Sequence, residues 1–274
     1  MRYRLVAVDL DNTLLAGLTG VSAGNRETLA RAAQAGCRVV ICTGRGRYTT
    51  RPVAEELGSG MGPHIVFNGG ATFACFDAEP EEVLLLPREA VECCWGAAVP
   101  LRVGVSGFED PHRGDRVYLA RPTPGLHKWA EQNRGRVVWV DSAEEVLARD
   151  LVALLFWGTA LQVKKLAAAL GRPEGLACPR RGESRLLESH LIELSAAGGT
   201  KGEALARLAG RLGIARSEIV AIGDAEPDIS MIEYAGFGVA VANGTDEVKA
   251  AADYVAPSAA EDGVAHVIEK FVLA

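Results

Sequence analysis

The chain has 274 residues, of which 49% are hydrophobic and 23% charged, and its formal net charge is −6. This balance is typical of a globular protein, and the length suits about two domains of roughly 150 residues each. The acidic charge favours neither nucleic acid nor an anionic membrane as a partner, and the apolar runs fall far short of the roughly 18 residues that cross a bilayer.

The N-terminus and the cysteines predict a cytoplasmic protein. Residues 1–4 lead directly into a short apolar run, without the hydrophobic region and cleavage site of a signal peptide. The six cysteines show no CxxC pair and no metal-ligand spacing, so we expect reduced thiols.

The first part of the chain alternates short apolar runs with helical patterns. In chain order the patterns predict a strand, a helix, a strand, a helix and a strand, over residues 5–8, 25–36, 37–42, 49–57 and 64–67. Nearly continuous apolar strands that are separated by helices favour a parallel sheet with both faces covered.

The order of predicted strands and helices becomes less regular between about residues 81 and 194, where prolines repeatedly interrupt the apolar runs. Strands are predicted at 82–87, 102–107, 116–121, 136–141 and 151–157. Helices are predicted at 88–98, 124–133, 143–149 and 160–170. We expect this stretch to form a separate α+β domain.

The alternation of short apolar strands with helices resumes from about residue 195 to the end. Helices are predicted at 200–213, 228–236, 246–252 and 262–273, and strands at 218–223, 237–242 and 254–256. The simplest fold is α/β, with a Rossmann-like parallel-sheet core formed by residues 1–80 and 195–274 and an inserted domain over 81–194.

Acidic and hydroxyl side chains follow three of the predicted core strands. Asp9 and Asp11 follow the strand 5–8, Thr43 follows 37–42, and Asp224 follows 218–223. Carboxyl ends of parallel strands share one sheet edge, where ligands of such sheets bind. A single Asp in this place can also be a helix cap or turn residue, but three carboxylates together favour a Mg²⁺ site completed by phosphate.

These groups suit phosphoryl transfer. A carboxylate can attack phosphorus and form an aspartyl-phosphate, and the reaction then needs mainly positioning and charge neutralisation. Lys201, at the start of a predicted helix, can supply a cation together with the N–H groups of a helix N-terminus, although a lysine there can equally be solvated.

Four motifs resemble those of the haloacid dehalogenase-like phosphatases, in the order found in the Cof-type branch. They are "DLDNTLL" (9–15), "ICTGR" (41–45), "GGTKGEAL" (198–205) and "IGDAEPDISMIEYAG" (222–236), and residues 241–271 are similar to the usual ending of the family. Residues 81–190 resemble the large α/β cap of this branch only in their position in the chain and in their mixed pattern of strands and helices. The resemblance implies that the cap selects the substrate.

The resemblance implies a role for each matching residue. Asp9 is expected to be the nucleophile and Asp11 the general acid that protonates the leaving alcohol and then activates water. The Mg²⁺ ligands are expected to be Asp9, the backbone carbonyl of Asp11, and Asp224.

The remaining matches concern phosphate binding. The resemblance assigns the phosphate cradle to the Leu10 backbone N–H, Thr43, the Gly44 backbone and Lys201. Asp228 is expected to position Lys201 or a metal-bound water.

Two residues depart from the family pattern. Asn12 stands where a glycine is usual, and asparagine tolerates the left-handed backbone that such a position requires. Pro227 stands where an asparagine commonly contacts phosphate or substrate, and proline cannot donate a hydrogen bond. Proline also favours an extended Glu226.

The sequence therefore predicts a Mg²⁺-dependent phosphomonoesterase acting on a small phosphorylated metabolite. A sugar phosphatase and a mannosyl-3-phosphoglycerate phosphatase are the two specific models, because arginines make parts of the cap basic: Arg102, Arg113, Arg116, Arg121, Arg180, Arg181 and Arg185. A solvated basic face explains the same arginines. A phosphotransferase or phosphomutase on the same core, and a phospho-ligand sensor without turnover, stay open as alternatives. The sequence does not indicate the oligomeric state.

Overall fold

The computed structural model describes residues 2–17, 20–58, 61–171, 173–177, 180–184 and 189–274. It divides the chain into two compact units. The core unit comprises Met1–Glu82 and Thr200–Ala274, and the cap unit comprises Val83–Gly199. Within the described residues, no helix combines the length and the apolar character needed to cross a membrane.

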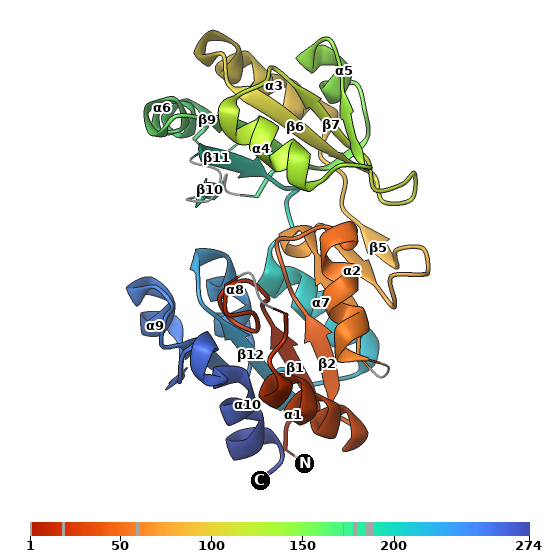
Figure 1. Ribbon diagram of the computed structural model, residues 1–274, viewed down its shortest axis with the longest axis vertical. Helices are drawn as coiled ribbons and strands as arrows, with labels where there is room; N and C mark the ends of the chain where they lie inside the picture. Colours follow the sequence, from red (N-terminus) through yellow and green to blue (C-terminus); the bar gives the residue numbers. More distant parts are fainter. Residues whose placement is uncertain (1, 18–19, 59–60, 172, 178–179, 185–188) are drawn as a thin grey trace. The chain divides into compact units, whose positions relative to one another are not determined.

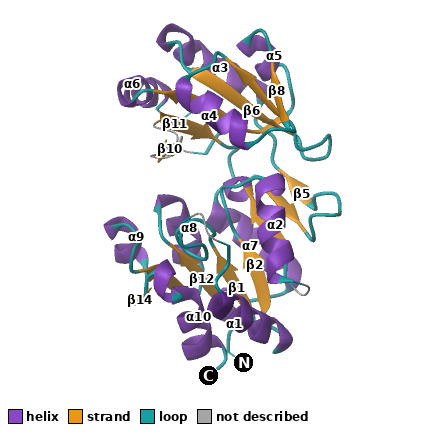
Figure 2. Cartoon of the chain, viewed as in Figure 1, coloured by secondary structure: helices purple, strands orange, loops and turns teal. Residues whose placement is uncertain are grey.

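A five-stranded parallel sheet forms the centre of the core unit (Figures 1 and 2). Its strand order is β14-β13-β12-β1-β2. The strands are β1 (Leu5–Val8), β2 (Arg38–Ile41), β12 (Ile219–Gly223), β13 (Phe237–Val241) and β14 (Tyr254–Ala256). The helices are α1 (Ala23–Gln34), α2 (Arg47–Leu57), α7 (Lys201–Leu212), α8 (Glu226–Tyr234), α9 (Asp246–Ala251) and α10 (Gly263–Val267), with a π turn at Ile268–Val272.

Both faces of this sheet are buried, which is why its strands are apolar without alternation. Val6 and Val8 of β1 point to the face that α1 and α10 cover, whereas Leu5 and Ala7 point to the face covered by α7 and α8. The predicted doubly covered parallel sheet is confirmed.

The strand predicted at 64–67 forms, but it is not part of the five-stranded parallel sheet. The strand β3 (His64–Val66) lies in a separate sheet of order β3-β4-β5, together with β4 (Ala71–Phe73) and β5 (Glu82–Val83). It is antiparallel to β4 and meets the main sheet through the isolated bridge between Cys42 and Ile65. The left-handed backbone of Phe67 and Asn68, with φ of 52° and 55°, ends the strand and turns the chain back.

The cap unit contains a six-stranded mixed sheet of order β10-β11-β9-β6-β7-β8. Its strands are β6 (Gly104–Glu109), β7 (Val117–Ala120), β8 (Val137–Trp139), β9 (Leu151–Gly158), β10 (Arg180–Ser184) and β11 (Ser189–Leu194). Its helices are α3 (Arg88–Ala98), α4 (Pro124–Gln132), α5 (Ala143–Leu147) and α6 (Ala160–Leu170), with a 3₁₀ turn at Val99–Leu101. Buried residues of α3, α5 and α6 form one apolar cluster with the sheet.

His64 makes the stability of the core unit dependent on pH. Burial lowers the pKa of His64 to about 4, and its Nδ1 accepts a hydrogen bond from the Ile41 backbone N–H at 3.2 Å. The unfolded chain takes up a proton near pH 6.5 that the folded chain excludes, so the contribution of His64 to stability is complete above pH 6.5 and is lost as the pH drops towards 4. The loss should reach about 3 kcal/mol at most.

Urea unfolding of the core unit between pH 7 and 4.5 measures this effect. His64→Asn keeps an acceptor near the position of Nδ1 and should become more stable relative to the wild type as the pH falls, whereas the change His127→Asn in the cap unit, at an exposed position, should follow the wild type at every pH. An unchanged slope in His64→Asn would show that another group is responsible.

Candidate active site

The carboxyl ends of three neighbouring strands bring the predicted site residues together. Asp9 directly follows β1, Asp224 directly follows β12, and Thr43 comes two residues after β2. β1 lies between β12 and β2, and the chain order of the strands reverses here. This switch point is where open α/β sheets bind their ligands.

Lys201 lies in the middle of the buried charges. It is the first residue of α7, whose N-cap Thr200 forms a capping box with Glu203. Its Nζ lies 2.6 Å from Asp9 Oδ1 and 2.5 Å from Asp228 Oδ1. Lys201 is 3% exposed, Asp9 5% and Asp228 1%, so solvent hardly weakens these contacts.

Asp228 ties α8 to this cluster through both of its carboxylate oxygens. Oδ1 accepts from Lys201, and Oδ2 accepts from the backbone N–H groups of Asp224 at 3.0 Å and Ala225 at 3.1 Å. The side chain is thereby fixed at the N-terminus of α8, where a carboxylate is favoured by the helix dipole. Asp228 therefore positions Lys201 and the backbone of Asp224.

The helix α8 begins at Glu226, two residues earlier than the sequence analysis predicts. Pro227 is the second residue of its first turn, where the missing N–H would have no helical partner in any case. The expectation of an extended Glu226 is wrong, because the extended residue is the N-cap Ala225, with φ of −133° and ψ of 171°. Pro227 thus fits the start of the helix without distortion.

Burial and mutual repulsion disfavour ionised carboxylates in this cluster. Burial raises the pKa of Asp9 to about 8, Asp228 and Asp224 add to the rise, and Lys201 opposes it. Burial likewise raises the pKa of Asp224 to about 6, with Asp228 adding and a hydrogen bond from Thr13 opposing. Burial would lower the pKa of Lys201, but the charges of Asp228 and Asp9 outweigh it and raise that pKa.

The three carboxylates can place one ligand atom each within 4.8 Å of the others. One lysine cannot neutralise three ionised carboxylates, so the donor set fits a divalent cation. Asp228 already uses both oxygens, which leaves Asp9 Oδ2 and a carboxylate oxygen of Asp224 as the better candidates. Oxygen donors of this kind suit Mg²⁺.

Asp11 lies apart from the buried cluster. Its side chain is 55% exposed and is held by Arg45, with Nε 2.9 Å from Oδ2 and Nη2 2.5 Å from Oδ1. The hydrogen bonds from Arg45 to Asp11 raise the pKa of the guanidinium. Sequence reasoning did not single out Arg45, although it lies in the same turn as Thr43 and Gly44.

The turn after β2 is built around backbone groups. Thr43 is fully buried, and its Oγ1 accepts a hydrogen bond from the Arg45 backbone N–H at 3.2 Å. A Cβ on Gly44 would lie 2.9 Å from the side-chain nitrogen of Asn68, so a larger residue here would have to displace the Asn68 amide. Asn68 is a second neighbour of the site that the sequence analysis missed.

The turn after β1 contains Leu10 and Asn12. The buried Leu10 offers its carbonyl to the N–H groups of the residues that follow, which closes the turn. Asn12 has φ of 58°, so the asparagine adopts the left-handed backbone expected for it. Its carbonyl accepts from Asn243 Nδ2 at 2.7 Å, and Thr13 Oγ1 donates to Asp224 Oδ1 at 3.2 Å. The sequence analysis assigned no role to Thr13 or Asn243.

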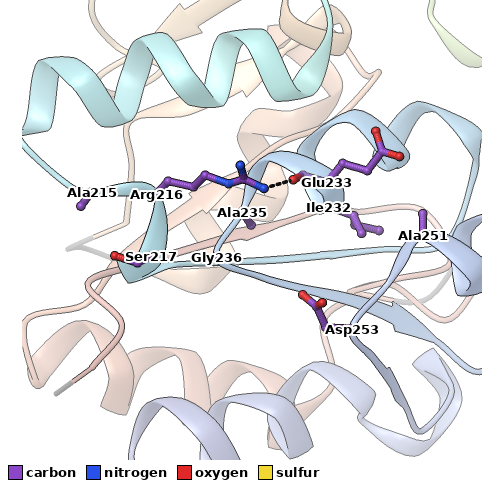
Figure 3. A pocket seen from close by; sticks show the side chains of 9 residues that line it. All are labelled: Ala215, Arg216, Ser217, Ile232, Glu233, Ala235, Gly236, Ala251 and Asp253. Atoms are coloured by element: carbon purple, nitrogen blue, oxygen red, sulfur yellow. Dashed lines mark hydrogen bonds between the residues drawn. The ribbon is translucent and has the colours of Figure 1, made fainter.

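A pocket of about 760 Å³ in the core unit lies away from these residues (Figure 3). Its walls come from the segment before β12 and from the C-terminal ends of α8 and α9. Arg216 crosses it and donates to the Glu233 carbonyl at 2.6 Å. It is lined by none of the predicted site residues, so the size of a pocket does not identify the candidate active site in this protein.

Comparisons with known proteins agree with this geometry. A family model described as haloacid dehalogenase-like hydrolase matches residues 6–268. The 5-amino-6-(5-phospho-D-ribitylamino)uracil phosphatase YwtE of Bacillus subtilis is 29% identical over 98% of this chain and 98% of its own. Phosphatase YwpJ of the same organism is 30% identical over 97% of this chain and 99% of its own.

A solved structure extends the similarity to three dimensions. A haloacid dehalogenase-like hydrolase from Bacteroides thetaiotaomicron is 30% identical, covers 98% of this chain and 99% of its own, and superposes with a TM-score of 0.82. The similarity therefore includes both the parallel-sheet core and the inserted cap.

Proposed function

The chain belongs to the haloacid dehalogenase-like hydrolase family, and from this premise we propose that it is a Mg²⁺-dependent phosphomonoesterase acting on small phosphorylated metabolites. The observation that carries the proposal is the buried contact of Lys201 with both Asp9 and Asp228, beside Asp224. Such a cluster is expensive to bury unless a cation and an anionic ligand complete it.

Asp9 is the proposed nucleophile. One carboxylate oxygen attacks phosphorus, the bond from phosphorus to the substrate oxygen breaks, and an aspartyl-phosphate forms. Water then attacks the same phosphorus, which releases phosphate and restores Asp9. Lys201 keeps Asp9 oriented by binding Oδ1 at 2.6 Å.

Asp11 is the proposed general acid and base. It delivers its proton to the leaving oxygen in the first step and accepts one from water in the second. In the structure both of its oxygens accept hydrogen bonds from Arg45. The acid step therefore requires Asp11 to separate from Arg45, so that one of its oxygens can reach the leaving group.

The phosphate would be held by the turns after β1 and β2 together with Lys201. We assign this role to the Leu10 backbone N–H, Thr43, the Gly44 backbone and Lys201. Mg²⁺, held by Asp9, Asp224 and the Asp11 carbonyl, would neutralise phosphate charge when bound. The cap unit, Val83–Gly199, would select the substrate.

The relatives favour a class of substrate for this chain but do not identify a single compound. The name of YwtE specifies a phosphorylated ribityl compound, which favours a sugar- or polyol-phosphate-like substrate for this chain as well. The mannosyl-3-phosphoglycerate model gains no support from the relatives described above. No observation favours a phosphotransferase, a mutase or a sensor over hydrolysis, and product analysis with an added sugar acceptor separates the first two.

Turnover should depend on the size of the divalent cation. With p-nitrophenyl phosphate as substrate, we expect activity with Mg²⁺, a loss of at least about 100-fold in excess EDTA, and inhibition by Ca²⁺. Asp9 and Asp224 flank a small oxygen site, and Ca²⁺ prefers longer distances and more ligands, which would misplace the phosphate. Equal rates with EDTA, Mg²⁺ and Ca²⁺ would contradict the proposed function.

A further inference from the structure

Two arginines of the cap unit border one small pocket. The pocket has a volume of about 340 Å³ and is lined by Val99, Arg102, Arg121 and Pro122. Arg102 follows the 3₁₀ turn at Val99–Leu101, and Arg121 follows β7. Neither residue belongs to the candidate active site described above.

The sheet of the cap unit brings the two arginines to the same edge. β6 and β7 are antiparallel, with Val105 opposite Ala120, so Gly104 comes to lie beside Arg121. A Cβ on Gly104 would be 2.9 Å from the Arg121 carbonyl oxygen, and only glycine permits this approach. Arg102 is two residues before Gly104, and the two turns therefore meet.

Both arginines have a left-handed backbone. The φ of Arg102 is 52° and that of Arg121 is 55°, values that side chains larger than glycine rarely adopt. The first turn is fixed by Gln162 Nε2, which donates to the Leu101 carbonyl at 2.8 Å. Strain of this kind is concentrated at ligand-binding sites, where it aims side chains at a ligand.

Among the described residues, neither guanidinium group is held by a close acidic partner, although the charge of Arg121 acts on the exposed Glu144 and helps to lower the pKa of that carboxyl. Within the described part of the chain, neither Arg102 nor Arg121 forms an ion pair, whereas Arg113 of the same unit binds Asp150 at 2.9 Å. The guanidinium carbon of Arg121 lies 4.4 Å from the centre of the Trp95 ring. Stacking on a ring fixes the guanidinium plane and leaves its N–H edge to bind a planar or tetrahedral anion.

We propose that this pocket binds an anionic oxygen group, a carboxylate or a phosphate, between Arg102 and Arg121. The group is either a second anionic group of the substrate or a separate anion, and only the first source rests on the proposed function. Two arginines that line one pocket, on a chain with a net charge of −6, concentrate positive charge where an anion can use it.

Binding is tested with inorganic sulfate, which the enzyme cannot hydrolyse. The full-length protein is titrated at constant ionic strength while NMR follows the indole N–H of Trp95, assigned with Trp95→Phe. We expect a saturable shift in the wild type and a loss of affinity of about tenfold or more in Arg102→Gln and Arg121→Gln. Arg113→Gln, which removes a cap charge that is already paired, should bind as the wild type does.

A Trp95 signal that does not respond to sulfate, or that responds equally in Arg102→Gln, would overturn the proposal. Sulfate bound only near Asp9 would leave Trp95 unchanged and would give this same negative result. The binding measurement needs no turnover. A chain that binds sulfate in this pocket but shows no phosphatase activity would therefore overturn the proposed function and would still support the proposed anion site.

Kinetics then separate the two sources of the anion. Glycerol 3-phosphate and 3-phosphoglycerate differ by one carboxylate. If the pocket holds a group of the substrate, Arg102→Gln should lower kcat/KM about tenfold for 3-phosphoglycerate and leave glycerol 3-phosphate unchanged. If it holds a separate anion, Arg102→Gln should change kcat/KM for both esters alike or for neither.

Discussion

Asp9→Asn should abolish turnover while the fold survives. An amide is a far poorer nucleophile than a carboxylate, and removal of a catalytic nucleophile typically lowers kcat by roughly 10⁴-fold or more. The Asn side chain keeps an oxygen that can accept the Lys201 contact now made by Asp9 Oδ1 at 2.6 Å. Phosphate release from p-nitrophenyl phosphate measures the loss, with mass spectrometry to exclude deamidation.

The same variant should be more stable than the wild type in EDTA at high pH. Because the folded chain raises the pKa of Asp9 to about 8, its stabilising contribution is complete below the ordinary pKa of 3.8 and is lost as the pH rises through 8. Asn stays neutral, so its advantage should grow from pH 6 to pH 8. The matched control Asp246→Asn, an exposed acid in α9, should change neither activity nor this trend. Activity of Asp9→Asn within tenfold of wild type would falsify the nucleophile assignment.

The parallel core could be predicted from the sequence because its strands are bounded by sharp chemical changes. The strand 5–8 and the strand 254–256 appear with the predicted bounds, since an apolar run begins and ends there abruptly. The cap strands β10 and β11 were missed. Their sequences, "RRGES" and "SHLIEL", are too polar and too short to show a buried face. The pairing of β11 with β9, and of β10 with β11, decides their structure.

The candidate site was predictable for a related reason. The carboxyl ends of parallel strands lie at one edge, so the position of Asp9 and Asp224 in the sequence places them together in space. The pairing of Asp11 with Arg45 was not predictable. It depends on the rotamers of two side chains and on the turn after β2, and neither leaves a periodic signal. The basic cap residues also have different environments that the sequence does not distinguish. Arg113 forms an ion pair, whereas Arg102 and Arg121 line one pocket. Arg185 and the side chains of Arg180 and Arg181 lie outside the described residues.

Lys201→Met should both inactivate and destabilise the protein. Lys201 is the only cation that contacts Asp9 and Asp228 in the described part of the chain, and all three side chains are buried. Removing one partner of a buried ion pair leaves charges without compensation and typically costs about 3–5 kcal/mol. Urea unfolding of the core unit at pH 8 in EDTA measures the change. Lys249→Met in α9 is the matched control and should stay within about 0.5 kcal/mol of the wild type.

The pH dependence identifies the cause of that loss. Without Lys201, the pKa of Asp9 should rise further, because the lysine charge that opposes the effect of burial is gone. Protonation would then relieve the repulsion, so the variant should recover stability as the pH falls from 8 to 5. A destabilisation that stays constant over this range would indicate lost packing of the lysine stem instead of lost charge.

A second substitution separates folding from chemistry. In Lys201→Met/Asp228→Asn one of the two uncompensated charges is removed, and the Asn oxygen can still accept the backbone N–H groups of Asp224 and Ala225. We expect this double variant to regain most of the lost stability and to remain inactive, because neither of the two new side chains can hold phosphate charge or orient Asp9. Recovery of both stability and activity would show that Lys201 acts on the fold alone, and would remove it from the proposed phosphate cradle.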